Sequence, residues 1–140
     1  VPLAEPWAAV ATLARRLGRF PVVPGNRVDF FADTPKTFAR LTADIDAAKH
    51  HAHLLFYIAA ADRSTEPVLA ALGRAAARGV RCRLVYDAHG SRAFAAALHA
   101  RLKGTGVEVV AALPVTGFGV RGVRADLRNH RKVAVIDGTV

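Results

Sequence analysis

The sequence predicts an α/β fold, a mostly parallel mixed sheet flanked by helices on both faces. Segments with apolar residues at helical spacing alternate along the chain with short runs rich in Val, Ile, Leu and Phe. Two of these runs, 54–60 and 133–136, are apolar throughout, as strands covered on both sides are. With 140 residues, 52% apolar and 22% charged, the chain is large and apolar enough to fold around one core.

Four helices are expected, because each apolar stripe has a start or stop signal beside it. Thr34-Pro35, for example, is an N-cap followed by a first-turn proline. Gly18, Gly79 and Gly104 stand where helix C-caps belong. From start signal to stop signal, the expected ranges are 7–18, 34–48, 64–79 and 91–104.

Five strands are expected between or after these helices, bounded by Gly, Pro or Asp. Their expected ranges are 27–31, 53–60, 80–86, 107–113 and 132–136. The stretch 114–128 has three glycines and little periodicity, so it is interpreted as a long loop. We therefore divide the chain into an N-terminal helix and linker, 1–24, and one domain, 25–140.

Several classes of protein are excluded by composition. The single cysteine, Cys82, rules out an internal disulfide and a cysteine zinc site, and its apolar surroundings indicate a small core residue. No stretch reaches the roughly 18–20 apolar residues of a membrane span, and the first twenty residues lack the charge order of a secretory signal. Because the chain starts at Val1 and contains no Met, we expect a processed product or a piece of a longer protein.

The segment 129–138 carries the sharpest chemical pattern. Residues i and i+2 of a strand share a face, so His130 and Lys132 are expected to point together. An imidazole beside an ammonium suits a phosphate group, which the histidine attacks while the lysine supplies positive charge. Asp137 has the opposite parity and precedes Gly138, so we expect it in a turn, bracing the backbone. An exposed pair at a strand start is the alternative interpretation of His130 and Lys132.

With its surroundings, this pattern, His-x-Lys-x-x-x-x-Asp, resembles the HKD motif of the phospholipase D superfamily. Segments upstream resemble the same superfamily in the same order, from Gly25-Asn26-Arg27-Val28 through 78–91 to 106–109. The whole is most like the N-terminal catalytic half of a bacterial cardiolipin synthase, over roughly residues 25–140.

The resemblance implies a role for each motif residue. His130 would attack the phosphodiester phosphorus and form a phosphohistidine, Lys132 would bind the non-bridging oxygens, and Asp137 matches the motif aspartate. The candidate substrate-binding residues are Arg128, Asn129 and Arg131. The resemblance implies no metal and no other cofactor, because histidine and lysine do what a metal ion would otherwise do.

Two departures from the family pattern bear on activity. The family's site uses two HKD motifs, and only one is present. The chain also stops at Val140, before the Gly-Ser or Gly-Gly stretch and the Asn that complete the phosphate pocket. We therefore expect a half-site that is inactive alone and is completed by a second HKD half, in the same chain or in a homodimer partner.

Other polar residues carry less weight. Three histidines fall within residues 50–53, but no further ligand is evident near them, so a metal site is not expected. Asp87 and His89 follow a strand at the edge where α/β sheets bind ligands, as do Asp62 and Arg63. Each pair either structures its loop or contacts substrate, and the loop role is favoured.

Charge points to an anionic partner. The net charge is +9, and the segment 121–132 holds five cations against one acid, Asp126. Such a cluster suits lipid headgroups or a nucleic-acid backbone, although it could be a solvated loop. No aromatic residue for base stacking is nearer than Phe118, which weighs against nucleic acid.

The leading hypothesis is a phosphatidyltransferase, cardiolipin synthase-like, acting on anionic phospholipids at the bacterial cytoplasmic membrane, with any membrane segments outside this chain. One alternative is an HKD phosphodiesterase or nuclease working as a homodimer. The other is a non-catalytic domain that binds anionic membranes.

Overall fold

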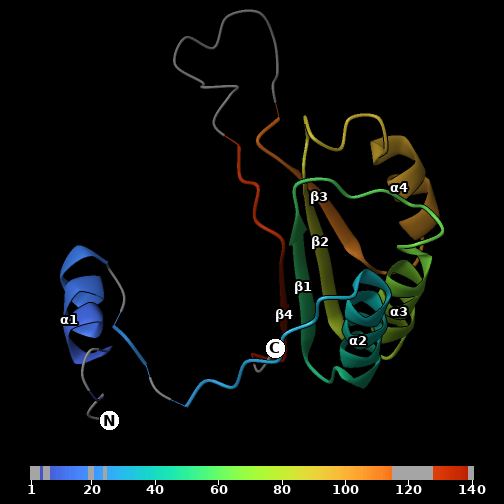
Figure 1. Ribbon diagram of the computed structural model, residues 1–140. Helices are drawn as coiled ribbons and strands as arrows, with labels where there is room; N and C mark the ends of the chain where they lie inside the picture. The colour runs from blue at the N-terminus through green and yellow to red at the C-terminus, as the bar shows by residue number, and fades with distance from the viewer. Residues whose placement is uncertain (1–3, 5–6, 19–20, 24, 115–127, 139–140) are drawn as a thin grey trace, which may run out of the picture. The chain divides into compact units, whose positions relative to one another are not determined.

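The computed structural model describes residues 4, 7–18, 21–23, 25–114 and 128–138. The chain divides into two units, Val1–Phe30 and Phe31–Val140. The first unit contains helix α1 (Trp7–Leu17). The second contains α2 (Thr34–Ala47), β1 (His51–Phe56), α3 (Glu66–Ala77), β2 (Arg81–Asp87), α4 (Ala95–Leu102), β3 (Glu108–Ala112) and β4 (Val133–Ile136) (Figure 1).

One four-stranded sheet, in the order β3-β2-β1-β4, organises the second unit. Strands β1, β2 and β3 are parallel, with α3 and α4 as the crossovers between them. Strand β4 runs antiparallel to β1 at the edge of the sheet. The predicted α/β fold, with a mostly parallel mixed sheet flanked by helices, is confirmed.

The core lies between this sheet and helices α2, α3 and α4. Alternate strand residues, such as Leu54 on β1 and Leu84 on β2, are buried against helix residues such as Leu72 and Leu98. Figure 1 shows these three helices on one side of the sheet. Residues of the other parity stay partly exposed, and Val135 on β4 is 39% exposed. The described helices of this unit thus lie on one face, whereas the sequence predicted helices on both.

Cys82 is 3% exposed within this core, as expected, and burial raises the pKa of its thiol. No helix in the described ranges is long and apolar enough to cross a bilayer.

The strand predicted at 27–31 does not form, so this prediction was wrong. The segment is irregular, and Val28 and Phe30 are 86% and 89% exposed. Its apolar residues suit a strand, but strand propensity acts through packing against a neighbouring strand, and no described strand pairs with this segment. Of the loop predicted at 114–128, residues 115–127 lie outside the described residues.

Two predicted boundaries move for a common reason. Strand β1 ends at Phe56 rather than at residue 60, and α4 begins at Ala95 rather than at Ser91. The Ser91 hydroxyl donates to the Tyr57 carbonyl oxygen and accepts from the Ala59 N–H, over 3.1 and 3.0 Å. These two bonds satisfy backbone groups beyond the β1 ladder, and Ser91 is not available as a helix cap.

Candidate functional site

Strand β4 positions the segment 129–138 by pairing with β1 in a fixed register. Ala52 is opposite Ile136, and Leu55 is opposite Val133. The residues before Val133 therefore reach the edge of the sheet where the parallel strands end. That edge is the usual place for ligands in α/β proteins.

His130 lies at this edge, against the residue that follows β1. Its ring stacks on Tyr57, with ring centroids 4.0 Å apart and planes inclined by 17°. His130 is solvent-exposed, whereas Tyr57 is partly buried. Face-to-face contact restrains the imidazole and leaves the nitrogens at the ring edge accessible.

Lys132 lies beside His130 at the same edge. The Lys132 Nζ donates to the carbonyl oxygen of His130 over 2.9 Å, and Lys132 is exposed. Both residues precede β4, so this contact, rather than strand parity, is what joins them. An ammonium has three N–H donors, and this contact uses one of them.

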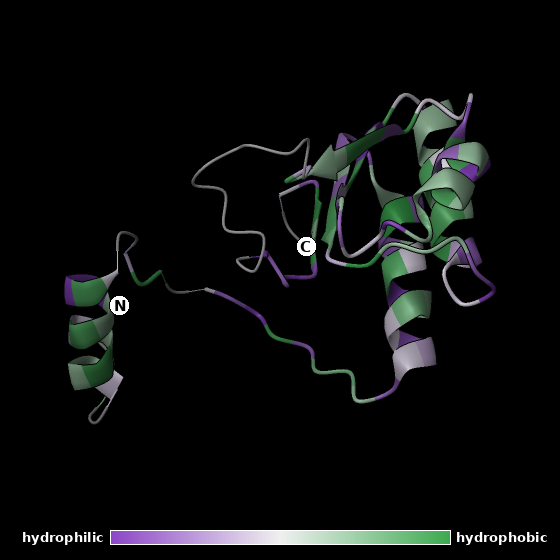
Figure 2. Cartoon of the chain, turned by 90° about the horizontal axis from the view of Figure 1, so that it is seen from above, coloured by the Kyte–Doolittle hydropathy of each residue, from purple (hydrophilic) through white to green (hydrophobic). Residues whose placement is uncertain are grey.

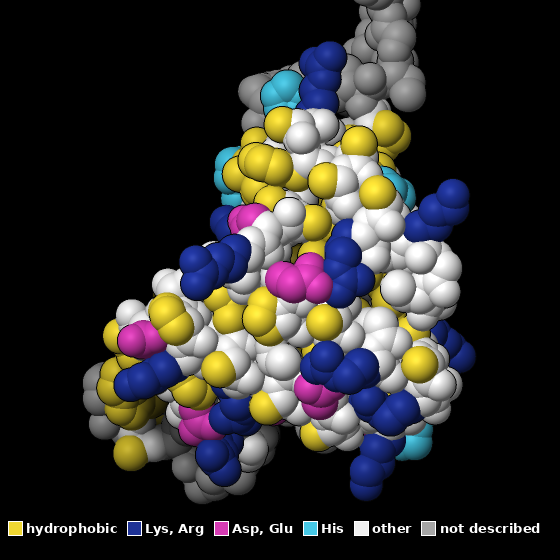
Figure 3. Space-filling view, turned by 90° about the vertical axis from the view of Figure 1, so that its right-hand side faces the viewer, with side chains coloured by type: hydrophobic (Ala, Val, Ile, Leu, Met, Phe, Trp, Pro, Cys, Tyr) yellow, Lys and Arg dark blue, Asp and Glu magenta, His cyan; other side chains and the backbone are white. Residues whose placement is uncertain are grey.

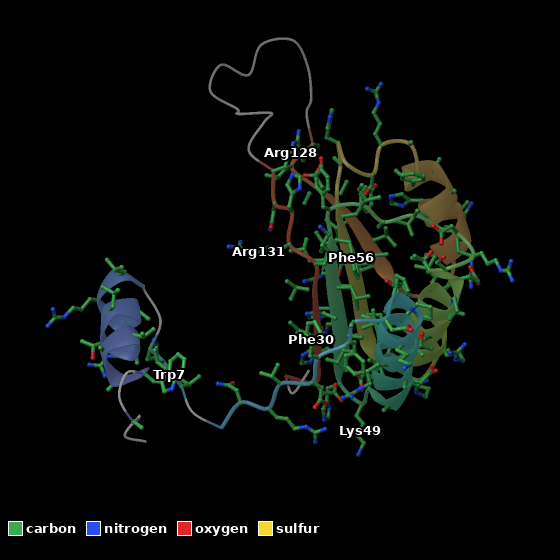
Figure 4. All side chains as sticks on the ribbon, in the orientation of Figure 1. Trp7, Phe30, Lys49, Phe56, Arg128 and Arg131 are labelled. Carbon is green, nitrogen blue, oxygen red and sulfur yellow. The ribbon has the colours of Figure 1, made fainter. Side chains whose placement is uncertain are left out.

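Arg128 and Asp87 form a buried ion pair beneath this segment. Arg128 Nη1 lies 3.3 Å from Asp87 Oδ2 and donates to the Leu113 carbonyl oxygen over 2.7 Å. The two side chains are 5% and 4% exposed. The pair ties the start of the segment to the carboxyl ends of β2 and β3 (Figure 4).

The carboxylate of Asp87 also organises the turn that follows β2. Its Oδ1 accepts from the backbone N–H groups of His89 and Gly90, over 2.9 and 2.8 Å. Burial acts to raise the pKa of Asp87, but these two bonds and Arg128 outweigh it, and the pKa lies below its ordinary value. Asp87 therefore stays ionised as the partner of Arg128.

The turn of residues 88–91 packs directly against the backbone at Tyr57. Ser91 is fully buried and bonds that backbone, as described above. A Cβ at Gly90 would lie 2.7 Å from the Tyr57 carbonyl oxygen and 2.9 Å from its ring Cζ. Only glycine fits here, so the turn fixes the ring on which His130 stacks.

Asp137 lies at the far end of β4 from His130. Its carboxylate accepts from the backbone N–H groups of Lys49, His50 and His51, over 2.8, 2.8 and 2.9 Å. Hydrogen bonds from the N–H of His51 and then of Lys49 and His50, with the charge of His50, lower its pKa to about 2. Asp137 and Gly138 have positive φ angles of 50° and 71°, as in the expected turn. The carboxylate therefore fixes the α2–β1 connection to the end of β4.

The other predicted site residues are placed as follows. Asn129 Oδ1 accepts from the Arg131 N–H over 3.1 Å and shapes the backbone around His130. Arg131 is exposed, and Figure 4 shows its side chain projecting away from the sheet.

The helix-covered side of the second unit carries charges of both signs. Figure 3 shows cations interspersed with acids there. Arg74 pairs with Asp46, Arg101 with Glu66 and Arg40 with Asp44.

The histidines of residues 50–53 lie at the opposite end of β1 from Tyr57. The rings of His51 and His53 are 4.9 Å apart. Burial, and then the charges of His51, Arg83 and Arg81, lower the pKa of His53. The described residues contain no group of three or more His, Cys, Asp or Glu side chains placed to hold a metal ion.

Sequence reasoning missed Tyr57, Gly90 and the pairing of Asp87 with Arg128. The Asp-x-x-Gly-Ser stretch was a signal for a turn after a strand, but nothing local pairs residues 41 positions apart.

A family described as cardiolipin synthase, PLD-like domain matches residues 41–140. The chain belongs to this phospholipase D-like family. The match covers all four strands, and with them His130, Lys132 and Asp137. The resemblance to the phospholipase D superfamily is confirmed.

Individual relatives of this phospholipase D-like domain agree. Cardiolipin synthase A from Yersinia pseudotuberculosis serotype O:1b (strain IP 31758) is 39% identical over 119 residues, which is 84% of this chain and 24% of that protein. The same values hold for cardiolipin synthase A from Yersinia pestis bv. Antiqua (strain Angola). The chain spans about a quarter of the length of these curated relatives.

Proposed function

We propose that this domain is one catalytic half of a phosphatidyltransferase of the cardiolipin synthase type, with an anionic phospholipid as substrate. The observation that carries the proposal is the accessible imidazole of His130, stacked on Tyr57 beside the ammonium of Lys132. The names of the relatives support the choice of lipid chemistry over nucleic acid.

The reaction proceeds in two steps, formation of a phosphohistidine and transfer of its phosphatidyl group to an acceptor alcohol. A ring nitrogen of His130 attacks the phosphorus of the donor phospholipid; the P–N bond forms as the P–O bond to the leaving alcohol breaks, and that alkoxide takes a proton. The oxygen of an acceptor alcohol then attacks the phosphohistidine, releases His130 and gives up its proton. Lys132 stabilises the non-bridging oxygens in both steps with the N–H donors that His130 leaves unused.

Other residues hold or extend this site. Arg128 acts as a positioning residue, since its guanidinium is buried against Asp87 and the Leu113 carbonyl oxygen. Asp137 positions the other end of β4 through three backbone N–H groups. Arg131 is exposed next to His130 and contributes positive charge toward the substrate, with Asn129 shaping the backbone between them.

The proton for the leaving alkoxide comes, in this proposal, from a second HKD half, in the same longer chain or in a homodimer partner. The domain works at the cytoplasmic surface of a bacterial membrane, where its lipid substrate is. The net charge of +9 favours binding to such an anionic surface.

A chromogenic diester tests the proposal on residues 1–140. The nitrophenolate of bis(4-nitrophenyl) phosphate leaves without a proton, so a half-site can complete the first step and stall. In EDTA we expect a burst of about one nitrophenolate per chain and an acid-labile adduct on His130, detected by mass spectrometry.

His130→Ala removes this burst, and Lys132→Ala slows it by about 100-fold, because a transition-state charge loses its partner. His89→Ala, an exposed histidine at the same edge, is the matched control and keeps the burst. A burst that survives His130→Ala rejects the proposal. Sustained turnover that rises per chain with protein concentration would instead favour the homodimeric phosphodiesterase.

A further inference from the structure

Helix α1 carries an apolar stripe that none of the described residues of its own unit covers. Trp7, Val10, Leu13 and Leu17 recur at spacings of three and four, which places them on one face of the helix. They are 63%, 56%, 57% and 79% exposed, and the helix has no buried residue. In Figure 2, hydrophobic colours dominate α1.

The opposite face of α1 is polar and basic. At 100° per residue, Thr12, Arg15 and Arg16 fall away from the stripe. Both arginines lie in the last turn, and the helix contains no acidic residue. The Thr12 hydroxyl donates to the Ala8 carbonyl oxygen over 2.9 Å, so its hydrogen bond is made within the helix.

Apolar side chains are also exposed in the part of the first unit that follows α1. Val22 and Val23 are 46% and 58% exposed, and Val28 and Phe30 are more exposed still. Eight of the fifteen exposed large hydrophobic side chains among the described residues therefore fall within the first thirty positions. Such a concentration marks an interaction surface rather than ordinary surface variation.

We propose that α1 lies flat in the headgroup layer of an anionic phospholipid bilayer, with its apolar stripe toward the acyl chains. Charge complementarity decides the occupant, because a basic face without acids, opposite a Trp- and Leu-bearing stripe, matches anionic headgroups. An eleven-residue helix is about 16 Å long, far short of a hydrocarbon core of about 30 Å, so it lies in the surface. The choice of phosphatidylglycerol as the probe lipid rests on the proposed function.

The sequence provides a direct reporter, since Trp7 is the single tryptophan of the chain. The experiment titrates residues 1–140 with vesicles of phosphatidylcholine containing 30% phosphatidylglycerol, with no substrate turnover required. We expect the Trp7 emission to shift to the blue and iodide quenching to fall, saturating with lipid. Pure phosphatidylcholine vesicles bind about ten-fold more weakly, because two arginines lose their anionic partners.

Matched variants assign the effect to the two faces. Leu13→Gln with Leu17→Gln removes the shift, while Thr12→Gln, on the polar face, leaves it unchanged. Arg15→Gln with Arg16→Gln weakens the preference for phosphatidylglycerol, and the cations elsewhere in the chain account for the part that remains. Circular dichroism with saturating vesicles shows whether each variant still forms the helix, and a stripe variant that is helical but unbound supports the proposal.

Three results overturn it. A blue, protected Trp7 before lipid is added means that α1 is covered by protein, by a second copy if the protection rises with protein concentration. An emission that vesicles never shift means that the bilayer is not the partner. Unchanged binding by the Leu13 and Leu17 double variant assigns binding elsewhere. The Leu13 and Leu17 double variant must keep the nitrophenolate burst on the soluble diester, so loss of the burst and loss of vesicle binding are separate failures.

Discussion

At the scale of single residues, the motif residues lie at two different places, although they are close together in the sequence. His130 and Lys132 are at the ligand-binding edge of the sheet, whereas Asp137 is at the other end of β4. Its carboxylate is occupied by three backbone N–H groups, so its chemistry is that of an anchor. The physical reason is that an ionised carboxylate is the strongest acceptor available for clustered amide donors.

Asp137→Asn tests this anchor. The carboxylate pKa is about 2 in the folded chain and about 3.9 in an unfolded chain. Its stabilising contribution is therefore complete above pH 4 and is lost as the pH falls from about 4 to 2. Asparagine lacks this titration and presents an N–H to an amide donor.

Urea unfolding midpoints between pH 6 and 2 provide the measurement. We expect the asparagine variant to be less stable at pH 6 and to lose less of its stability on acidification than the wild type. Asp44→Asn, which alters a surface pair with Arg40, serves as the control and keeps the acid-dependent loss. An Asp137→Asn chain with an unaltered pH profile would show that the anchor contributes nothing.

At the scale of elements, the turn of residues 88–91 and the end of β1 form one packed unit beneath His130. Gly90→Ala probes that unit, since the new Cβ would overlap the Tyr57 carbonyl oxygen at 2.7 Å. The ring of Tyr57 must move, so we expect a loss of about 2 kcal/mol in unfolding free energy, in the range of overpacked sites, and a slower nitrophenolate burst.

Gly73→Ala in α3 is the matched control. A Cβ there meets Thr105 no closer than 3.7 Å, and alanine favours a helix by up to about 1 kcal/mol. Equal stability and equal burst rates in the two variants would remove the argument that the turn supports Tyr57.

The elements also show which features a sequence reveals. The start of helix α2 was predictable to within one residue, because Thr34 and Pro35 are local start signals; the N-cap itself is Asp33 rather than the predicted Thr34, and the Asp33 side chain accepts from the Lys36 N–H. The run of β4 and the turn at Asp137 and Gly138 were local patterns as well. The register of β4 on β1, the stacking of Tyr57 on His130 and the burial of Arg128 depend on residues far apart in the chain, which periodicity does not connect. The strand predicted at 27–31 failed for the same reason, because strand formation requires a partner.

At the scale of the whole molecule, the second unit rests on one apolar layer between the sheet and its three described helices. Leu72 on α3 lies at its centre and is fully buried. Leu72→Ala leaves a cavity, and we expect a loss of about 3 kcal/mol in unfolding free energy. Val135→Ala, on the sheet face away from the helices, removes a side chain that is 39% exposed and costs less than about 1 kcal/mol.

Urea denaturation followed by circular dichroism compares these two variants. The same titration followed through the NMR signal of the His130 ring shows whether the site unfolds with the core. If one apolar layer holds the whole unit together, the circular dichroism and His130 NMR transitions coincide in each variant. A His130 transition at lower urea than the core transition would mean that β4 detaches before the rest of the sheet.

The antiparallel pairing of β4 also bears on how the chain acquires its structure. β1 meets β2 after one helix, but Ala52 reaches Ile136 only across most of the domain. Contacts so distant in sequence form late, because a long loop must close before they stabilise anything. During synthesis, the edge of β1 therefore remains uncovered until β4 emerges, and an uncovered strand edge is a template for association with other chains. The strand that holds His130, the nucleophile of the proposed function, at the edge of the sheet is also the one that protects the growing sheet from aggregation.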